Sequence, residues 1–443
     1  MEDVTRLTFS PDALAAAVAS REPVVFGGAA LAWPAITRWA DGGLCERTNG
    51  QLGRVYRQEH SHIFSYEASP EENVPTTRAR YTDDESAPPR NEVSMSCAEF
   101  LRWAESDAAH QCYVSWDFPG PDDEPNDGID RLALDLPDWA PLAINETDSG
   151  TPNSAVWMGA RGVVAQSHYD IQHNIFAQLR GDKTFVVAPP SAALAYRLFP
   201  EAHVRSRQSQ LEALPTAGAP LREAHLRPGD VLYLPPLWLH RVTAGAELSV
   251  SVNRFQDSRE NAGARALVRA GLPPALRKPR KDDLPFPSRV ALLALWLRFL
   301  LHRACGGAAS ATAADAADAA AATVLRPHLE SRFGLLHERI GCASWAPSLC
   351  PPRGELSPSL VDEARAHAEA AAAALDEWLP AGRCGARRED DSCAADAAAA
   401  DDAARRELLL QQHAELTGRA VVGVPQLCGF LRCLALGAES WAT

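Results

Sequence analysis

One short stretch of this chain decides its fold and its chemistry: Ser167-His168-Tyr169-Asp170-Ile171-Gln172-His173-Asn174-Ile175-Phe176. Side chains on a β-strand alternate between two faces, so we expect His168, Asp170, Gln172 and Asn174 on one face of a strand that runs from Gln166 to Arg180. A histidine and a carboxylate two residues apart on one face can bind the same metal ion. A His-x-Asp pair also occurs by chance on surface strands, so its meaning depends on the residues around it.

A second histidine completes the predicted metal site. Residues 230–236 are apolar like a buried strand, and His240 lies at the end of that segment. Two histidines and one carboxylate form a facial triad that leaves coordination positions open, which suits non-haem Fe(II) and oxygen chemistry. We therefore predict that His168, Asp170 and His240 are metal ligands and form the catalytic centre.

The sequence around these residues predicts a mainly β fold. From Ala155 to Phe255, short apolar strands alternate with turns such as Arg180-Gly181-Asp182 and Arg227-Pro228-Gly229-Asp230, which we interpret as hairpin turns. This density of short strands favours a double-stranded β-helix, or jelly-roll, with its core at about residues 145–257. Helix and strand signals that precede the core predict an N-terminal α/β decoration.

The remainder of the chain predicts helices. We expect a catalytic domain at 1–258, a linker at 259–289 and a helical, alanine-rich region at 290–443. The segment from Val290 to Arg303 is apolar around most of its circumference, and a second helix is expected from Val324 to Ile340. Such surface needs a partner, which predicts a homodimer through these helices; the alternative is burial by the alanine-rich helices of the same chain.

Composition narrows the class of protein. The formal net charge of −14 disfavours general binding to a phosphate backbone. The ten cysteines include no Cys-x-x-Cys pair, so we expect mostly free thiols in a reducing compartment. The first residues lack a basic start and an apolar run, and Val290 to Leu301 is too short to span a bilayer. These features predict an intracellular protein of the cytoplasm or nucleus with no membrane association.

Lys183 is the residue that points to an anionic ligand. It starts a predicted strand on which Lys183, Phe185 and Val187 share a face, so its ammonium group can lie in the interior. A buried lysine is costly unless an anion accompanies it. The alternative is a solvent-exposed lysine at the edge of a turn.

Three runs of this sequence, His168 to Pro190, Arg227 to His240 and Leu248 to Phe255, resemble the JmjC (cupin-8-like) group of Fe(II)- and 2-oxoglutarate-dependent oxygenases. Within that group the likeness is greatest to the asparaginyl hydroxylases that act on hypoxia-inducible factor. The resemblance implies a cupin-type jelly-roll that uses Fe(II), 2-oxoglutarate and O2.

The resemblance also implies roles for individual residues. His168, Asp170 and His240 would hold iron, while Lys183, Tyr113, Asn174 and Asn253 would contact 2-oxoglutarate or line the space near the metal. Arg207 and Gln208 would bind a peptide substrate. One departure is Ala165, because the family often has a threonine three residues before the first ligand; Gln166 or Ser167 could replace its hydrogen bond.

We therefore expect a 2-oxoglutarate-dependent dioxygenase that hydroxylates a protein side chain. The alternatives are a tRNA-base hydroxylase of the same group, a non-catalytic cupin-like binding module, and a zinc- or manganese-dependent cupin isomerase. A protein or peptide partner is favoured over nucleic acid because no Phe, Tyr or Trp lies between Val204 and Asp230 to stack on bases.

Overall fold

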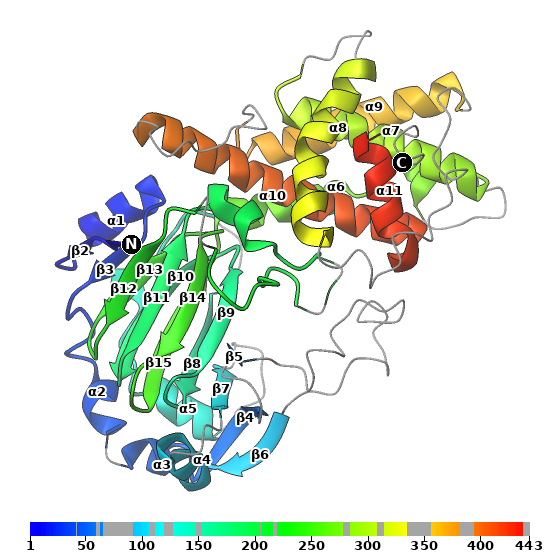
Figure 1. The fold of residues 1–443 in the computed structure, drawn as a ribbon. Helices are drawn as coiled ribbons and strands as arrows, with labels where there is room; N and C mark the ends of the chain where they lie inside the picture. The colour runs from blue at the N-terminus through cyan, green and yellow to red at the C-terminus, as the bar shows by residue number, and fades with distance from the viewer. Residues whose placement is uncertain are drawn as a thin grey trace. The chain divides into compact units, whose positions relative to one another are not determined.

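Short strands joined by turns build two mixed β-sheets in the computed structural model (Figure 1). One sheet has six strands, in the order β1 (Glu2–Asp3), β12 (Arg222–Leu226), β11 (Lys183–Ala188), β14 (Leu239–Ala244), β9 (Val164–Tyr169) and β5 (Ile63–Phe64). The other has nine, in the order β2 (Arg6–Leu7), β3 (Val24–Phe26), β13 (Val231–Leu234), β10 (His173–Arg180), β15 (Ser249–Gln256), β8 (Asn153–Gly159), β7 (Gln111–Asp117), β4 (Gln51–Gln58) and β6 (Glu92–Ser96).

The structure describes the following residues: 1–40, 42–58, 63–64, 92–106, 111–118, 127–147, 152–201, 203, 205–215, 219–277, 284–307, 314–334, 356–380 and 394–436. They form two units. The first comprises Met1–Glu72, Pro88–Pro189 and Gly218–Ser258, and the second comprises Asn73–Ala87, Pro190–Ala217 and Arg259–Thr443.

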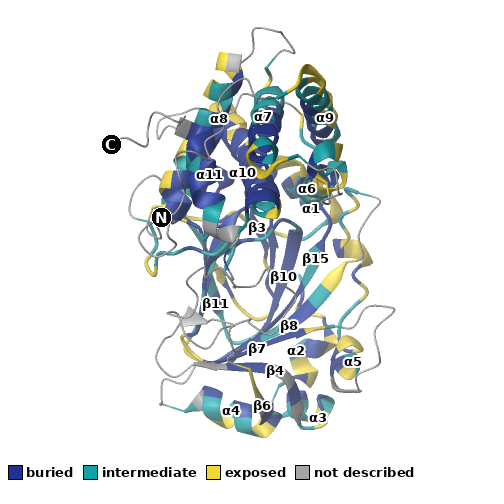
Figure 2. Cartoon of the chain, turned by 90° about the vertical axis from the view of Figure 1, so that its right-hand side faces the viewer, coloured by how far each residue is buried: buried dark blue, intermediate teal, exposed yellow. Residues whose placement is uncertain are grey.

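From β8 to β15 the chain changes sheets at every step except that from β11 to β12, which confirms the predicted jelly-roll class. Strands β8, β10, β13 and β15 belong to the nine-stranded sheet, whereas β9, β11, β12 and β14 belong to the six-stranded sheet. Apolar side chains of both sheets meet between them, among them Phe176 and Leu232 from one and Phe185, Val187 and Leu226 from the other. Figure 2 shows this burial along β10 and β11.

The predicted hairpin turns are wrong, and the reason is this alternation. Arg180-Gly181-Asp182 joins β10 to β11, and Arg227-Pro228-Gly229-Asp230 joins β12 to β13, but in each case the two strands lie in different sheets. A turn motif reverses the chain direction locally and does not specify which strands become hydrogen-bonded neighbours.

The predicted continuous strand from Gln166 to Arg180 is also wrong. It is two strands, β9 and β10, which lie in different sheets and are separated by residues 170–172. His240 likewise does not end the preceding strand, because β13 stops at Leu234 and His240 is the second residue of β14. Asp170 therefore lies at a corner between sheets, immediately after β9.

Short helices accompany the sheets of the first unit: α1 (Pro11–Ser20), α2 (Pro34–Arg38), α3 (Gly43–Arg47), α4 (Cys97–Glu105) and α5 (Asp127–Ala133). Helix α1 begins with a capped first turn. The Ser10 side chain accepts a hydrogen bond from the backbone N–H of Ala13, and Pro11 occupies the first turn.

The second unit is helical: α6 (Arg259–Ala270), α7 (Phe286–Ala304), α8 (Ala314–His328), α9 (Pro358–Asp376), α10 (Ala394–Val422) and α11 (Val424–Leu436). Helix α6 and the start of α7 lie within the stretch 259–289 that the sequence suggested was a linker. The segment from Pro190 to Ala217, between β11 and β12, also belongs to this unit. Within the unit, Ser331 Oγ donates to the Leu194 carbonyl, 2.8 Å away.

Helix α7 is buried by helices of its own chain. It packs against α8, α9 and α10, and Leu292, Leu293, Trp296 and Leu300 are at most 1% exposed. The alanine-rich segments thus supply the intramolecular burial that was the alternative to a homodimer. The premise of the dimer prediction is removed, and the oligomeric state stays untested. None of the described helices is long and apolar enough to cross a membrane.

The expectation of mostly free thiols is wrong. Cys45 and Cys97 form a disulfide that joins α3 to the start of α4. Cys305, Cys428 and Cys433 in the helical unit are disulfide-bonded as well, whereas Cys112 is a buried free thiol. Cysteine spacing did not reveal these bonds, since the bonded residues are brought together by the fold.

Candidate metal and co-substrate site

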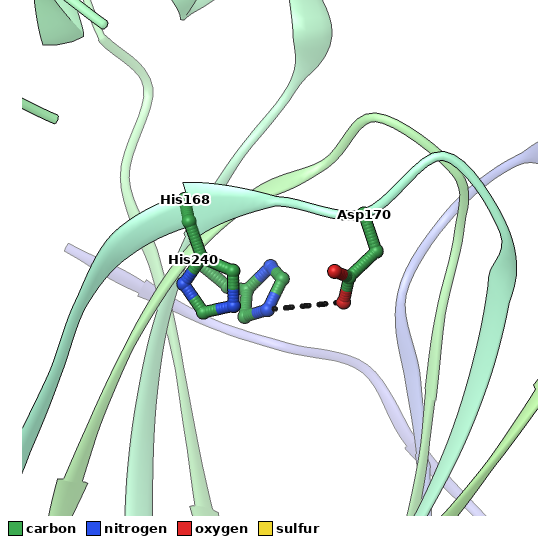
Figure 3. A group of neighbouring side chains, drawn as sticks. All are labelled: His168, Asp170 and His240. Carbon is green, nitrogen blue, oxygen red and sulfur yellow. Dashed lines mark ion pairs between the residues drawn. The ribbon is translucent and has the colours of Figure 1, made fainter. Parts of the chain in front are cut away.

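His168, Asp170 and His240 come together as the sequence predicts (Figure 3). His168 and His240 are direct neighbours across β9 and β14, and their ring centroids are 4.1 Å apart. The His240 Nε2 atom lies 3.7 Å from Asp170 Oδ2, and one ligand atom from each residue lies within 4.8 Å of the others. Two ring nitrogens and one carboxylate oxygen are a donor set that fits divalent iron.

Backbone carbonyls orient both histidines. The Nδ1 atom of His168 lies 2.6 Å from the Gln166 carbonyl oxygen, and the Nδ1 atom of His240 lies 3.0 Å from that of Trp238. A carbonyl only accepts, so each Nδ1 carries a proton, and in the neutral form of either ring Nε2 has the free lone pair. Burial, followed by the charge of His168, lowers the pKa of His240 to about 4, despite the opposing effect of Asp170. His240 is therefore neutral at pH 7, as a metal ligand must be.

The two segments that carry the triad are joined at their corners. The backbone N–H of Leu237, in the turn before β14, donates to the Asp170 carbonyl at 2.7 Å. Leu237 has a φ of 64°, which is unusual for a branched residue, and its side chain is fully buried. This contact holds Asp170 beside the β14 histidine although Asp170 lies outside a strand.

Strand register places Lys183 and the histidines on one face of the six-stranded sheet. Val187 pairs with His240, and His240 pairs with His168, so these residues point to the same side. Lys183 and Phe185 share that side with Val187 by alternation along β11. The rings of Phe185 and His240 stack at 6.4 Å.

Lys183 is buried without a carboxylate partner among the described residues. It is 2% exposed, and its Nζ donates to Ser251 Oγ at 2.7 Å. The Phe176 and Tyr113 ring centroids lie 5.1 and 5.9 Å from the ammonium group. Burial lowers the pKa of Lys183 to about 7. The prediction that Lys183 points inward is confirmed, and the alternative of a solvent-exposed lysine is wrong.

The nine-stranded sheet presents a matching face. Asn253 pairs with Phe176, Ser251 pairs with Trp157, and Gly159 pairs with Tyr113. Alternation then places one set of residues on the side that Lys183 reaches: Tyr113, Trp157, Asn174, Phe176, Ser251 and Asn253. The predicted residues Tyr113, Asn174 and Asn253 therefore belong to the same face.

Ser251 and Trp157 are members of this face that sequence analysis missed. Their strands contained the necessary signal, because Ser251 is two residues before Asn253 and Trp157 lies within the apolar run of β8. Which of the two faces of β8 is the inner one became known only from its register with β15.

Ala165 shares the inner face with His168 because of a β-bulge. His240 pairs with His168 and Val242 pairs with Ala165, so β9 contains one residue more than β14 between these pairs. Ala165 carries no hydroxyl, and the Gln166 amide oxygen accepts from Arg241 at 3.3 Å. The hydroxyl that contacts Lys183 is that of Ser251. Whether Gln166 or Ser167 replaces the missing threonine hydrogen bond stays a prediction.

Arg207 and Gln208, the predicted substrate-binding residues, belong to the second unit and not to the unit that holds the triad. Arg207 has a φ of 69°, and its Nη2 lies 3.6 Å from a carboxylate oxygen of Glu201. The Gln208 carbonyl accepts from the backbone N–H of Phe199 at 2.8 Å. Their role stays a prediction.

A jelly-roll that presents two histidines from neighbouring strands, with an aspartate immediately after one of them, defines the class of cupin-type proteins with a candidate metal site. Comparison with known families agrees. Residues 11–261, more than half of the chain, match the family described as "Cupin-like domain", and the chain belongs to that family of cupin-like JmjC domains.

Several characterised proteins share part of this sequence. The chain is 32% identical over 122 residues to Jumonji C domain-containing protein 5 of Drosophila melanogaster, covering 26% of this chain and 30% of that protein. It is 29% identical over 135 residues to tRNA wybutosine-synthesizing protein 4 of Aspergillus oryzae, covering 28% of this chain and 13% of the relative.

A longer match is to the lysine-specific demethylase JMJ31 of Arabidopsis thaliana, with 23% identity over 270 residues, 53% of this chain and 46% of that protein. The chain thus spans less than half of each of these relatives. The narrower likeness to asparaginyl hydroxylases is not supported by these matches and stays a prediction.

Proposed function

We propose that this protein is an Fe(II)- and 2-oxoglutarate-dependent oxygenase that hydroxylates a protein side chain. The observation that supports it most is Lys183, a buried ammonium group on the same sheet face as the triad. A protein that used the triad only as a structural or zinc site would have no need for an unpaired buried cation, which is costly by itself. A carboxylate-bearing co-substrate removes that cost.

In this proposal, separate groups of residues would bind the iron and the 2-oxoglutarate. His168, Asp170 and His240 would hold the iron, with their orientation kept by the carbonyls of Gln166 and Trp238. Iron with 2-oxoglutarate supplies the activation of O2 needed for C–H hydroxylation.

Lys183 and Ser251 would bind the distal carboxylate of 2-oxoglutarate by charge-assisted hydrogen bonds. Phe176 and Phe185, whose rings meet edge to face at 4.9 Å, would exclude water beside them. Tyr113 lies on the same face and would add a hydroxyl to this carboxylate site.

A peptide substrate is favoured by the residues around Arg207. A guanidinium group and the Gln208 amide offer donors and an acceptor for an extended backbone or a carboxamide. The net charge of −14 works against recognition of a polyanion.

A tRNA-base hydroxylase is the second candidate, and one specific observation favours it. Proteins named tRNA wybutosine-synthesizing protein 4 and, from Danio rerio, tRNA wybutosine-synthesizing protein 5 match part of this sequence. A common domain does not determine the substrate, since substrate choice depends on the residues around the site.

The test is release of succinate from 2-oxoglutarate by the full-length protein with Fe(II), measured alone, with a peptide library and with tRNA. Stimulation by peptides supports protein hydroxylation, and stimulation by tRNA alone supports the second candidate. If wild-type protein shows no turnover above an Asp170→Ala control and no binding of 2-oxoglutarate, the chain is a non-catalytic module.

A further inference from the structure

Three side chains on the inner face of the nine-stranded sheet form a chain of hydrogen bonds. Trp157 Nε1 donates to Asn253 Oδ1 at 2.7 Å, and Asn253 Nδ2 donates to Asn174 Oδ1 at 3.0 Å. The three residues come from β8, β15 and β10, which are adjacent in the sheet. Asn174 and Asn253 are 5% and 1% exposed, so water offers them few alternative partners.

The direction of this chain is set at Trp157. An indole N–H can only donate, whereas an asparagine amide can rotate by a half turn and exchange its donor and acceptor. Because Trp157 needs an acceptor, Asn253 must present its oxygen to Trp157 and its NH2 group towards Asn174. Asn174 must then use its own oxygen to accept, which directs its NH2 group away from Asn253.

The consequence is a site that offers donors and not acceptors. No other described residue accepts a hydrogen bond from Asn174 Nδ2. If the amide of Asn174 were reversed, an oxygen atom would replace this donor and would repel an anionic ligand. The ammonium group of Lys183 lies over the ring of Phe176, which is on the same strand as Asn174. This ammonium group and the NH2 group of Asn174 are suited to a ligand with negatively charged oxygens.

We propose that Trp157 is a positioning residue that fixes the amide orientations of Asn253 and Asn174, so that Asn174 donates to a carboxylate oxygen of 2-oxoglutarate. This inference rests on the proposed function, because it concerns binding of the same co-substrate. It assigns to Trp157 the role of setting the donor-to-acceptor direction of this chain of hydrogen bonds, in addition to its packing against the core between the sheets.

The test is calorimetric binding of 2-oxoglutarate to full-length protein loaded with Mn(II) in the absence of O2. Trp157→Phe keeps an aromatic ring but removes the donor, so we expect 2-oxoglutarate to bind about tenfold to a hundredfold more weakly, the loss typical of a hydrogen bond to a charged group. Mn(II) affinity, measured separately, should stay unchanged because Trp157 does not touch the triad.

A double-mutant cycle shows whether the loss of affinity arises from the chain of hydrogen bonds or from the smaller volume of phenylalanine. If Trp157 acts through Asn174, Trp157→Phe should cost no further affinity in an Asn174→Ala background. Asn253→Asp is a second, nearly isosteric variant, which can accept from Trp157 but cannot donate to Asn174 when ionised. Asn253→Asp should also weaken 2-oxoglutarate binding, and it provides the test if Trp157→Phe does not fold.

Unchanged affinity of Trp157→Phe, or of Asn253→Asp where the first variant does not fold, overturns the proposal. The proposal is also overturned if Trp157→Phe weakens 2-oxoglutarate binding by the same factor in the Asn174→Ala background. In either case the wild-type protein still binds 2-oxoglutarate. If wild-type protein with Mn(II) shows no binding, it is the proposed function that fails, so the two failures are distinguishable.

Discussion

At the scale of single residues, the candidate site depends on groups whose protonation is set by burial. His240 stays neutral at pH 7 because burial and the charge of His168 lower its pKa to about 4. Burial alone lowers the pKa of Lys183 to about 7, so its charge depends on whether an anion lies beside it. On a solvent-exposed strand, neither side chain would have its pKa lowered by burial.

Replacing Asp170 with alanine tests the triad. We expect the affinity for Fe(II) or Mn(II) to fall by more than about 100-fold, since loss of a residue that only orients a ligand already costs up to that amount. The fold should persist, because the backbone bond from Leu237 to the Asp170 carbonyl does not involve the side chain. Equilibrium dialysis and far-UV circular dichroism measure the two quantities.

The matched control for that variant is Asp182→Ala, which removes a carboxylate from the turn before β11, where it faces His225 and not the triad. It should bind metal like the wild type. Equal metal affinity for wild type and Asp170→Ala would remove Asp170 from the site.

The lowered pKa of Lys183 predicts a pH dependence with a definite sign. Below pH 7 the lysine is protonated in both the folded and the unfolded protein, and the full cost of its burial is present. Between about pH 7 and 10.5 the unfolded state binds more protons, so this group makes the free protein more stable as pH rises. If Lys183 binds the distal carboxylate of 2-oxoglutarate, as we propose, binding requires the charged lysine, so the affinity for 2-oxoglutarate should fall by up to about tenfold per pH unit above pH 7.

Calorimetry at pH 8 in buffers of different ionisation enthalpy measures the proton taken up on binding. Lys183→Met is the control: its residual binding should be weaker by roughly 30-fold or more and should lack this proton uptake. Binding at pH 8 with no proton uptake by the wild type would contradict the role of Lys183.

At the scale of elements, the site exists because consecutive strands change sheets. The connection from β10 to β11 places Asn174 and Phe176 on one sheet and Lys183 on the other, so that Lys183 reaches Ser251 across the interior. Gly181 permits this connection. It has a φ of 61°, and an added Cβ would lie 2.4 Å from the Leu248 carbonyl oxygen.

Gly181→Ala should therefore destabilise the first unit by more than the roughly 1–2 kcal/mol cost of a positive φ alone. The control is Gly162→Ala, at a φ of 71° with nothing within 4 Å of the added Cβ, which should cost only that backbone term. Chemical denaturation of both variants gives the comparison. Equal losses of stability would show that the Leu248 backbone can move away.

At the scale of the whole molecule, disulfides contradict the expectation of mostly free thiols, and burial of α7 by its own chain removes the premise of the predicted homodimer. The Cys45–Cys97 bond joins residues 52 apart in sequence, and cysteines of the helical unit are bonded too. Disulfides persist in oxidising compartments, so the prediction of a cytoplasmic or nuclear protein, which rested in part on free thiols, has lost that part of its support and stays untested.

Replacing Cys45 and Cys97 together with alanine should lower the free energy of unfolding by roughly 2–4 kcal/mol, because the open chain gains entropy when unfolded. Cys112→Ala removes a buried free thiol and is the control for loss of a sulfur atom. Thermal melting measures both variants. Alkylation of Cys45 and Cys97 in unreduced, denatured wild-type protein would contradict the bond.

The sequence alone determined the class of fold and the identity of the predicted triad. Short apolar strands, the spacing of His168 and Asp170, and the inward parity of Lys183 all follow from local alternation, which is a property of the strand itself. Helix α1 and most of α7 were predictable for a similar reason, since capping residues and apolar periodicity act within a few turns.

The pairing of strands, and therefore which side chains meet, became known only from the three-dimensional structure. That β9 and β10 separate at Asp170, that Ser251 contacts Lys183, and that Trp157 faces Asn253 all depend on pairing between residues tens of positions apart. The same holds for the Cys45–Cys97 bond and the burial of α7 by its own chain. Such contacts are chosen by burial and hydrogen bonding over the whole core, and no local pattern of residues encodes that choice.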